Sequence, residues 1–151
     1  VKALAFRGLH QHYAYWPDST VTSRDRKNVR EGRYAIWGYV HMLLQLTGTT
    51  PVSAAGKYFV DLIQGTLSPA PSFNATDAIV DSHLTPVCAM KVTHDIEGAP
   101  MKPYSDAAPC GCYFENRATG VAPSSCTVCT GTGQGSCANG QMCRLGFCEA
   151  K

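Results

Sequence analysis

The chain has 151 residues, of which 44% are hydrophobic and 16% charged, and its formal net charge is +2. This length suits one domain with an appendage, and the hydrophobic fraction excludes wholesale disorder. A net charge so close to zero gives no electrostatic reason to expect nucleic acid or an anionic membrane as a partner. The longest apolar run, residues 34–46, is too short for a membrane-spanning helix, so the sequence predicts no membrane span.

The first forty residues predict two strands and a short helix. Residues 1–6 form an apolar run compatible with a strand. The charged residues 24–31 stop at Gly32, which predicts one or two helical turns with a glycine terminator. Residues 34–44 are rich in aromatic and branched side chains and predict a buried strand, with a helical second half as the open alternative.

Two helices and a further strand are expected next. Thr50 and Pro51 suit the N-cap and first position of a helix that Gly65 ends, with one apolar face made of Val52, Ala55, Phe59, Leu62 and Ile63. Asn74 is expected to cap a second helix, with Asp77 reaching back to it and a buried side of Ile79, Val80, His83 and Leu84. Pro86 should end this helix, and residues 87–92 predict a strand.

The cysteines divide the chain into an α/β region, residues 1–100, and a disulfide-rich tail of little periodicity, residues 101–151. Seven of the eight cysteines lie in the last 42 residues, among glycine, serine and threonine: Cys110, Cys112, Cys126, Cys129, Cys137, Cys143 and Cys148. The eighth is Cys88. An even count in a segment too poor in large apolar residues to form its own core predicts four disulfides and an oxidising compartment: the periplasm, the cell surface or the medium. Because seven is odd, one tail cysteine, Cys110 or Cys112, is expected to pair with Cys88. The remaining connectivity stays open.

Residues 28–45, NVREGRYAIWGYVHMLLQ, resemble a segment of bacterial periplasmic substrate-binding proteins of the phosphate type, which serve ABC importers. Six residues match its pattern in order and spacing: Asn28, Val29, Gly32, Tyr34, Ile36 and Trp37. The resemblance extends over residues 1–92 and implies part of a type 2 periplasmic-binding lobe. It also implies that a companion N-terminal polypeptide or lobe supplies most anion ligands. The chain starts at Val1 without a leader-like segment, so it is expected to be processed or to be the back part of a larger protein. The cysteine-rich tail departs from the family pattern.

A hydroxyl-rich loop is the candidate ligand site. Ser19 and Thr20 precede Arg24 at an expected helix start, where hydroxyls, backbone N–H groups and a guanidinium can hold an oxyanion. The alternative interpretation is an ordinary helix cap by Thr22 or Ser23.

Two metal-site hypotheses remain beside this one. His10 and His12 have a spacing that metal sites use, and Asp18 and His41 are further potential ligands, although no hydrolytic metal motif is present. Residues 126–133 spell CxxCxGxG, the pattern of chaperone zinc fingers, but only one copy occurs where a tetrahedral site needs two.

The sequence therefore predicts a non-enzymatic extracytoplasmic binding protein, or the C-terminal part of one, for a small oxyanion such as phosphate. No cofactor or metal is expected, and neither nucleic acid nor a membrane span. Three alternatives stay open: a secreted structural or adhesion module, a small extracellular metal-dependent enzyme using His10, His12 and Asp18, and a zinc-binding module.

Overall fold

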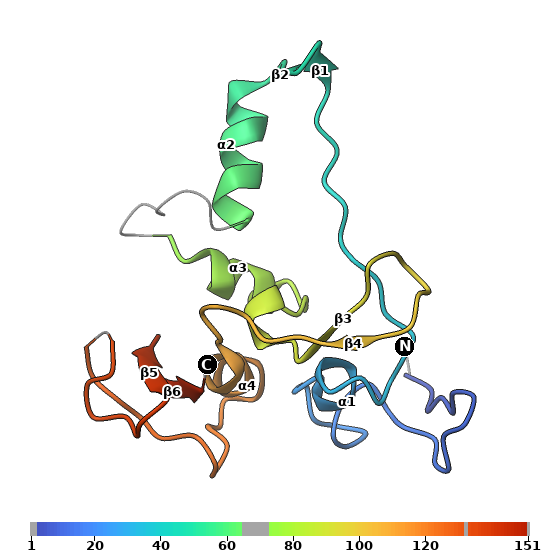
Figure 1. The fold of residues 1–151 in the computed structure, drawn as a ribbon, viewed down its shortest axis with the longest axis vertical. Coiled ribbons are helices and arrows are strands. Elements are labelled where there is room, and N and C mark those ends of the chain that lie inside the picture. The colour runs from blue at the N-terminus through green and yellow to red at the C-terminus, as the bar shows by residue number, and fades with distance from the viewer. Residues whose placement is uncertain (1–2, 65–72, 132, 151) are drawn as a thin grey trace.

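The computed structural model describes residues 3–64, 73–131 and 133–150 of the chain. Its elements are short and follow one another as α1 (Lys27–Arg30), β1 (Leu46–Thr47), β2 (Thr50–Pro51), α2 (Ala54–Ile63), α3 (Ala75–Asp81), the 3-10 helix η1 (Val87–Ala89), β3 (Val92–Thr93), β4 (Lys102–Pro103), α4 (Gly111–Thr119), β5 (Gln141–Arg144) and β6 (Phe147–Ala150) (Figure 1). Successive strands pair into antiparallel ladders, β1 with β2, β3 with β4 and β5 with β6. The substrate-binding lobe that the resemblance implies stays a prediction.

The main apolar core joins α3, η1 and α4. Its buried members are Val80, Ala89, Cys110 and Phe114, and Phe114 is only 2% exposed. Two of these residues come from the expected α/β region and two from the expected tail. The tail also differs from the irregular course expected of it, since it contains α4 and the β5–β6 hairpin. The two regions therefore share one core.

Four disulfides confirm the prediction made from the cysteines. They link Cys88 to Cys110, Cys112 to Cys126, Cys129 to Cys143, and Cys137 to Cys148. The first bridge confirms that Cys88 pairs with one of the two expected tail cysteines. Among the described helices, none has both the length and the apolar character that a bilayer crossing requires.

Several expected boundaries differ from the observed ones. The charged helix is only four residues long, but Gly32 does follow it with a φ of 75°, the left-handed conformation that a glycine terminator adopts. In the described part of residues 1–6, Phe6 forms only an isolated bridge to Tyr15. Residues 34–44 lie outside every helix and ladder, because no described strand runs beside them to accept their backbone hydrogen bonds.

The helix expected after Thr50 begins later. Ser53 is its N-cap and accepts a hydrogen bond from the N–H of Gly56 at 3.0 Å, while Thr50 and Pro51 belong to the β1–β2 hairpin. Of the expected apolar face only Leu62 is buried, and Phe59 is 53% exposed. The expected terminator, Gly65, lies outside the described residues.

The second expected helix is confirmed as α3. Asn74 caps it by accepting hydrogen bonds from the N–H groups of Thr76 and Asp77. The Asp77 carboxylate accepts from the Tyr113 hydroxyl, so the expected contact back to Asn74 is replaced by one to α4.

Other expectations for this region fail. Val80 is buried as predicted, whereas His83 and Leu84 are exposed. Residues 87–89, expected in a strand, form η1 instead, because the Ala89 N–H donates to the carbonyl of Pro86 at 2.9 Å.

Candidate functional site

A groove of about 320 Å³ lies between α3, α4 and the segment that precedes α1. Its polar lining consists of Arg24, Arg26, Asp81, His83 and Arg117. Val80, Leu84, Phe114 and Ala118 supply the apolar part of the lining. We call it the arginine groove. The core packing of α3 against α4 holds its two walls together.

Two of the three arginines are paired with carboxylates. Arg26 donates through Nη1 to both carboxylate oxygens of Asp18 at 2.7 Å. Arg117 donates through Nε and Nη2 to Asp81 at 3.0 and 2.6 Å, and these contacts lower the pKa of Asp81. A guanidinium carries five N–H donors, so both arginines retain donors beyond those used in these pairs.

Arg24 is the unneutralised cation of the groove. Its exposed side chain makes no hydrogen bond or ion pair with any described residue. Two other lining residues, Arg26 and His83, have left-handed backbones with φ of 47° and 62°. Such conformations are costly for non-glycine residues and concentrate at functional sites. The groove therefore combines a free guanidinium with two strained backbone positions.

The loop with the other predicted ligand residues is already occupied by one of the chain's own carboxylates. The Asp25 Oδ1 accepts hydrogen bonds from the N–H groups of Ser19 at 2.8 Å and Lys27 at 3.1 Å. Burial alone would raise the pKa of Asp25, but the hydrogen bonds from Ser19, Lys27 and Ser23 outweigh it and lower the pKa. The Ser23 hydroxyl also accepts from the Thr20 N–H at 3.0 Å. Ser19 and Thr20 are thus outside the groove lining, and of the three predicted residues only Arg24 belongs to it.

The structure does not bring together the residues of either metal-site hypothesis as free ligands. His10 and His12 are exposed, whereas Asp18 is buried and bound to Arg26. Within the described ranges, the one group of potential ligands close enough for a metal is the sulfur set of Cys129, Cys137 and Cys148. Each of these sulfurs is in a disulfide, so none is available as a zinc-binding thiolate.

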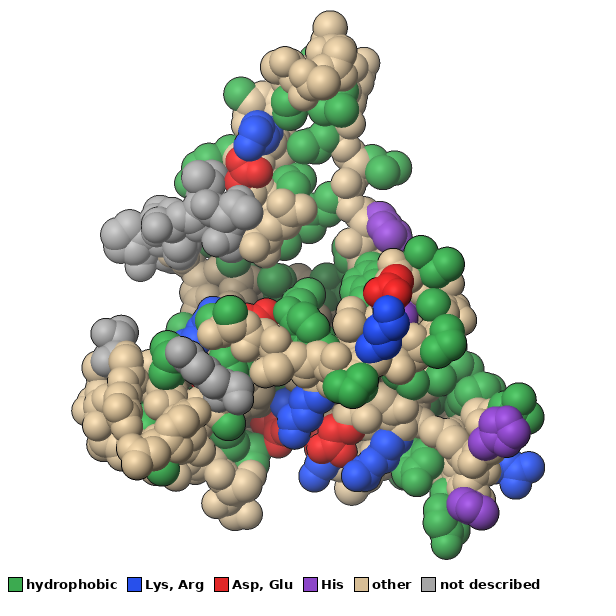
Figure 2. All heavy atoms as spheres, viewed as in Figure 1, with side chains coloured by type: hydrophobic (Ala, Val, Ile, Leu, Met, Phe, Trp, Pro, Cys, Tyr) green, Lys and Arg blue, Asp and Glu red, His purple; other side chains and the backbone are tan. Residues whose placement is uncertain are grey.

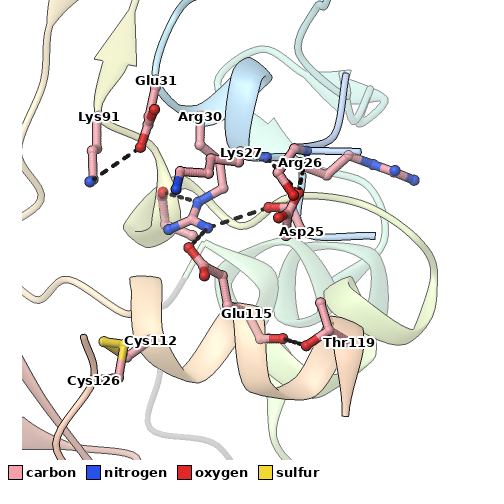
Figure 3. A network of polar contacts seen from close by, with 12 residues as sticks. Asp25, Arg26, Lys27, Arg30, Glu31, Lys91, Cys112, Glu115, Thr119 and Cys126 are labelled. Atoms are coloured by element: carbon pink, nitrogen blue, oxygen red, sulfur yellow. Dashed lines mark hydrogen bonds and ion pairs between the residues drawn. A yellow bond between two sulfur atoms is a disulfide. The ribbon is translucent and has the colours of Figure 1, made fainter. Parts of the chain in front are cut away.

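Arg30 connects the groove-bearing segment to the core (Figure 3). It is 3% exposed and donates to the carbonyl of Ala89 at 2.8 Å and to the carboxylate of Glu115 at 2.6 Å. Its guanidinium carbon lies 5.1 Å from the centre of the Phe114 ring, a cation–π distance. One side chain thereby joins α1, η1 and α4. A Cβ on Gly111 would lie 2.9 Å from Nη2 of this guanidinium, so a larger residue at the start of α4 would displace the Arg30 side chain.

The start of α4 is capped from the far end of the chain. Oε1 of Glu149, on β6, accepts hydrogen bonds from the N–H groups of Cys112 at 2.8 Å and Tyr113 at 3.1 Å. Burial raises the pKa of this carboxyl, although those hydrogen bonds and the charge of Arg30 lower it in part. The β5–β6 hairpin is therefore coupled to α4 through a carboxyl that is sensitive to pH.

We expect Glu149→Gln to change how stability depends on pH. Because the folded pKa lies above the usual value of 4.5, the stability that this group contributes is complete below that value and is lost as the pH rises through the folded pKa. A tenfold difference in proton affinity between the folded and unfolded chain corresponds to about 1.4 kcal/mol. The glutamine cannot ionise but can still accept both hydrogen bonds, so the variant should gain stability relative to the wild type as the pH rises above about 4.5.

Urea unfolding with the disulfides intact measures this difference at each pH. Glu97→Gln, at an exposed carboxyl, is the matched control. Parallel pH profiles for Glu149→Gln and the wild type would contradict the assignment.

Comparison with protein families, curated proteins and solved structures finds no match to this chain. The site must therefore be interpreted from its own geometry. Sequence reasoning missed Arg26, His83 and Arg117 as groove residues. The available signal was weak, because these residues lie far apart in the chain: Arg26 precedes α1, His83 follows α3, and Arg117 lies on α4.

Proposed function

We propose that this chain is an extracytoplasmic binding module for a small oxyanion such as phosphate, with the arginine groove as its binding site. The observation that carries the proposal is Arg24, a guanidinium at the groove without a carboxylate partner among the described residues. The resemblance to phosphate-type binding proteins supports the same ligand class. The four disulfides support a location in the periplasm, on the cell surface or in the medium.

Binding would rest on charge-assisted hydrogen bonds. Arg24 supplies the net positive charge, and the donors left over on Arg26 and Arg117 supply further N–H groups. The apolar side of the groove, from Leu84 and Ala118, restricts water on one side and strengthens these bonds. In the family that the chain resembles, two lobes close around the ligand. A companion polypeptide or lobe would complete this site in the same way.

Isothermal titration calorimetry with inorganic phosphate at low ionic strength tests the proposal. The wild type should bind, and Arg24→Gln should weaken binding about tenfold or more, because a hydrogen bond to a charged group contributes about 1.5–3 kcal/mol. Arg7→Gln is the matched control, since it removes the same charge from an exposed arginine that does not line the groove.

The Arg7→Gln control distinguishes phosphate binding in the groove from general electrostatic attraction of phosphate to the protein. If phosphate binds by net charge alone, both variants weaken binding equally. An equal loss, or a wild type that takes up no phosphate, would exclude the groove as an oxyanion site.

A secreted structural or adhesion module is the second candidate. One observation favours it: the half-cystines Cys129, Cys137, Cys143 and Cys148 form a buried cluster of their own, separate from the groove. Two disulfides in one cluster make this part of the chain rigid without a ligand. Absence of phosphate binding combined with an intact disulfide set would favour this function. Catalysis by His10, His12 and Asp18 stays a prediction.

A further inference from the structure

A projecting arm, residues 35–63, exposes far more apolar surface than it buries. It comprises the extended segment before β1, the β1–β2 hairpin and α2. The hairpin and α2 stand away from the rest of the chain, whereas the extended segment contacts residues 93–97 through Trp37, Tyr39 and His41 (Figure 1). Leu43 is 94% exposed and Leu62 alone is buried. The other large apolar residues exposed on the arm are Ile36, Tyr39, Val40, Met42, Leu46, Val52, Tyr58 and Phe59. Figure 2 shows hydrophobic side chains along this arm and few charged ones.

The accessible surface area of the chain can be compared with that of a compact monomer of the same mass. The chain exposes 10168 Å². A compact monomer of 16.2 kDa exposes about 7,500 Å², which leaves an excess of about 2,700 Å². Large obligate dimers bury about 2,000–5,000 Å² in total, counted over both subunits. One subunit of such a dimer buries about 1,000–2,500 Å², so the excess is slightly more than a large dimer interface requires of each chain.

Between Gly38 and Leu43, Tyr39 is the one residue whose backbone is hydrogen-bonded to a described residue. The Tyr39 N–H donates to a Glu97 carboxylate oxygen at 3.1 Å, which ties one edge of this segment to the body of the protein. The backbone groups of Gly38, Val40 and Met42 make no hydrogen bond with any described residue. Successive N–H groups of an extended strand point to opposite edges, so these three residues share the edge that faces away from Glu97.

We propose that this edge pairs with the same edge of a second copy of the chain, in an antiparallel strand pair centred on Val40. In that register Gly38 lies opposite Met42 and Val40 lies opposite Val40, and all hydrogen bonds come from the free edge. A two-fold interface requires such self-complementarity. The arm also suits a second copy electrostatically, since its one lysine and one aspartate, Lys57 and Asp61, pair with each other.

Sedimentation velocity and light scattering test the proposal on the intact, oxidised chain. The wild type should have twice the chain mass, and Val40→Lys should be monomeric because it places two lysines opposite each other at the two-fold axis. Val121→Lys is the matched control and should remain dimeric. Val40 and Val121 are 61% and 69% exposed, so neither lysine disturbs the core.

A disulfide cross-link tests the proposed register, in which Val40 lies opposite Val40 of the second copy. Paired residues with mutual hydrogen bonds have Cα atoms about 5.5 Å apart, within the range of a disulfide. Val40→Cys should therefore form a covalent dimer under mild oxidation, whereas Val121→Cys should not. Hydrogen exchange at residues 38–44 should be slow in the wild type and fast in Val40→Lys.

Two results would overturn the proposal. One is a monomeric wild type with rapid exchange at residues 38–44, which would leave a companion polypeptide as the occupant of the arm. The other is a dimer that Val40→Lys leaves intact. Neither result bears on the arginine groove, because phosphate binding and dimerisation are measured separately and Val40 is not among the groove residues.

Discussion

Arg30→Met should lower the free energy of unfolding by about 3 kcal/mol, because it removes the buried arginine from an ion pair whose carboxylate, Glu115, is 23% exposed. The methionine fills much of the volume but leaves the Glu115 carboxylate without its cation. It also leaves the Ala89 carbonyl without its donor, and removes the guanidinium from the Phe114 ring. Denaturant unfolding with intact disulfides measures the loss.

Two further variants separate the causes. Arg33→Met is the matched control: its pair with Glu31 lies at the surface and its side chain is 53% exposed, so the change should stay within about 0.5 kcal/mol. Adding Glu115→Leu to Arg30→Met removes the orphaned charge and should recover part of the stability. A loss below about 1 kcal/mol for Arg30→Met would show that this arginine does not hold α1, η1 and α4 together.

Arg30 also illustrates what the sequence could not predict. In the sequence it belongs to a run of basic residues that is typical of a solvated helix face, yet it is buried. Its partners, Ala89 and Glu115, lie 59 and 85 residues away. Local signals were sufficient where the cause is local: Asn74 caps α3, and Gly32 has the left-handed backbone that follows α1. The cysteine count also predicted that disulfides form, because this depends on an even number of cysteines and on an oxidising compartment. Which cysteines pair depends on the fold, and the count left that open.

Failures occurred where tertiary contacts decide the structure. Helix α4 has little apolar periodicity and one buried side chain, Phe114, so no helical pattern marks it in the sequence. It is held by the Glu149 cap and by two disulfides. Residues 34–44 have strand-forming side chains but no described neighbour strand, which is the observation behind the proposed dimer. In the groove, Arg24 was predicted as an anion ligand from its position near hydroxyls. The ligand role of Ser19 stays a prediction, and its N–H donates to Asp25, a contact that the sequence did not indicate.

The double substitution Cys88→Ala/Cys110→Ala should lower the free energy of unfolding by about 3–5 kcal/mol. Opening a loop with a sequence separation of 22 residues restores about 3 kcal/mol of chain entropy to the unfolded state. A further loss comes from the core, because Cys110 is 0% exposed and packs with Phe114, Val80 and Ala89. Thermal unfolding followed by circular dichroism measures the combined effect.

The matched control is Cys137→Ala/Cys148→Ala, which opens a shorter loop, with a separation of 11 residues, within the C-terminal cystine cluster. This control should destabilise the hairpin and, through the Glu149 cap, the first turn of α4, while hydrogen exchange at α3 stays slow. Loss of the Cys88–Cys110 bridge should instead make exchange fast in both α3 and α4, because Val80 of α3 packs in the same cluster as Cys110. Since those helices form the walls of the arginine groove, phosphate binding should weaken in parallel. If α3 and α4 keep slow exchange without the bridge, the apolar contacts alone hold the groove, and the disulfide does not set its shape.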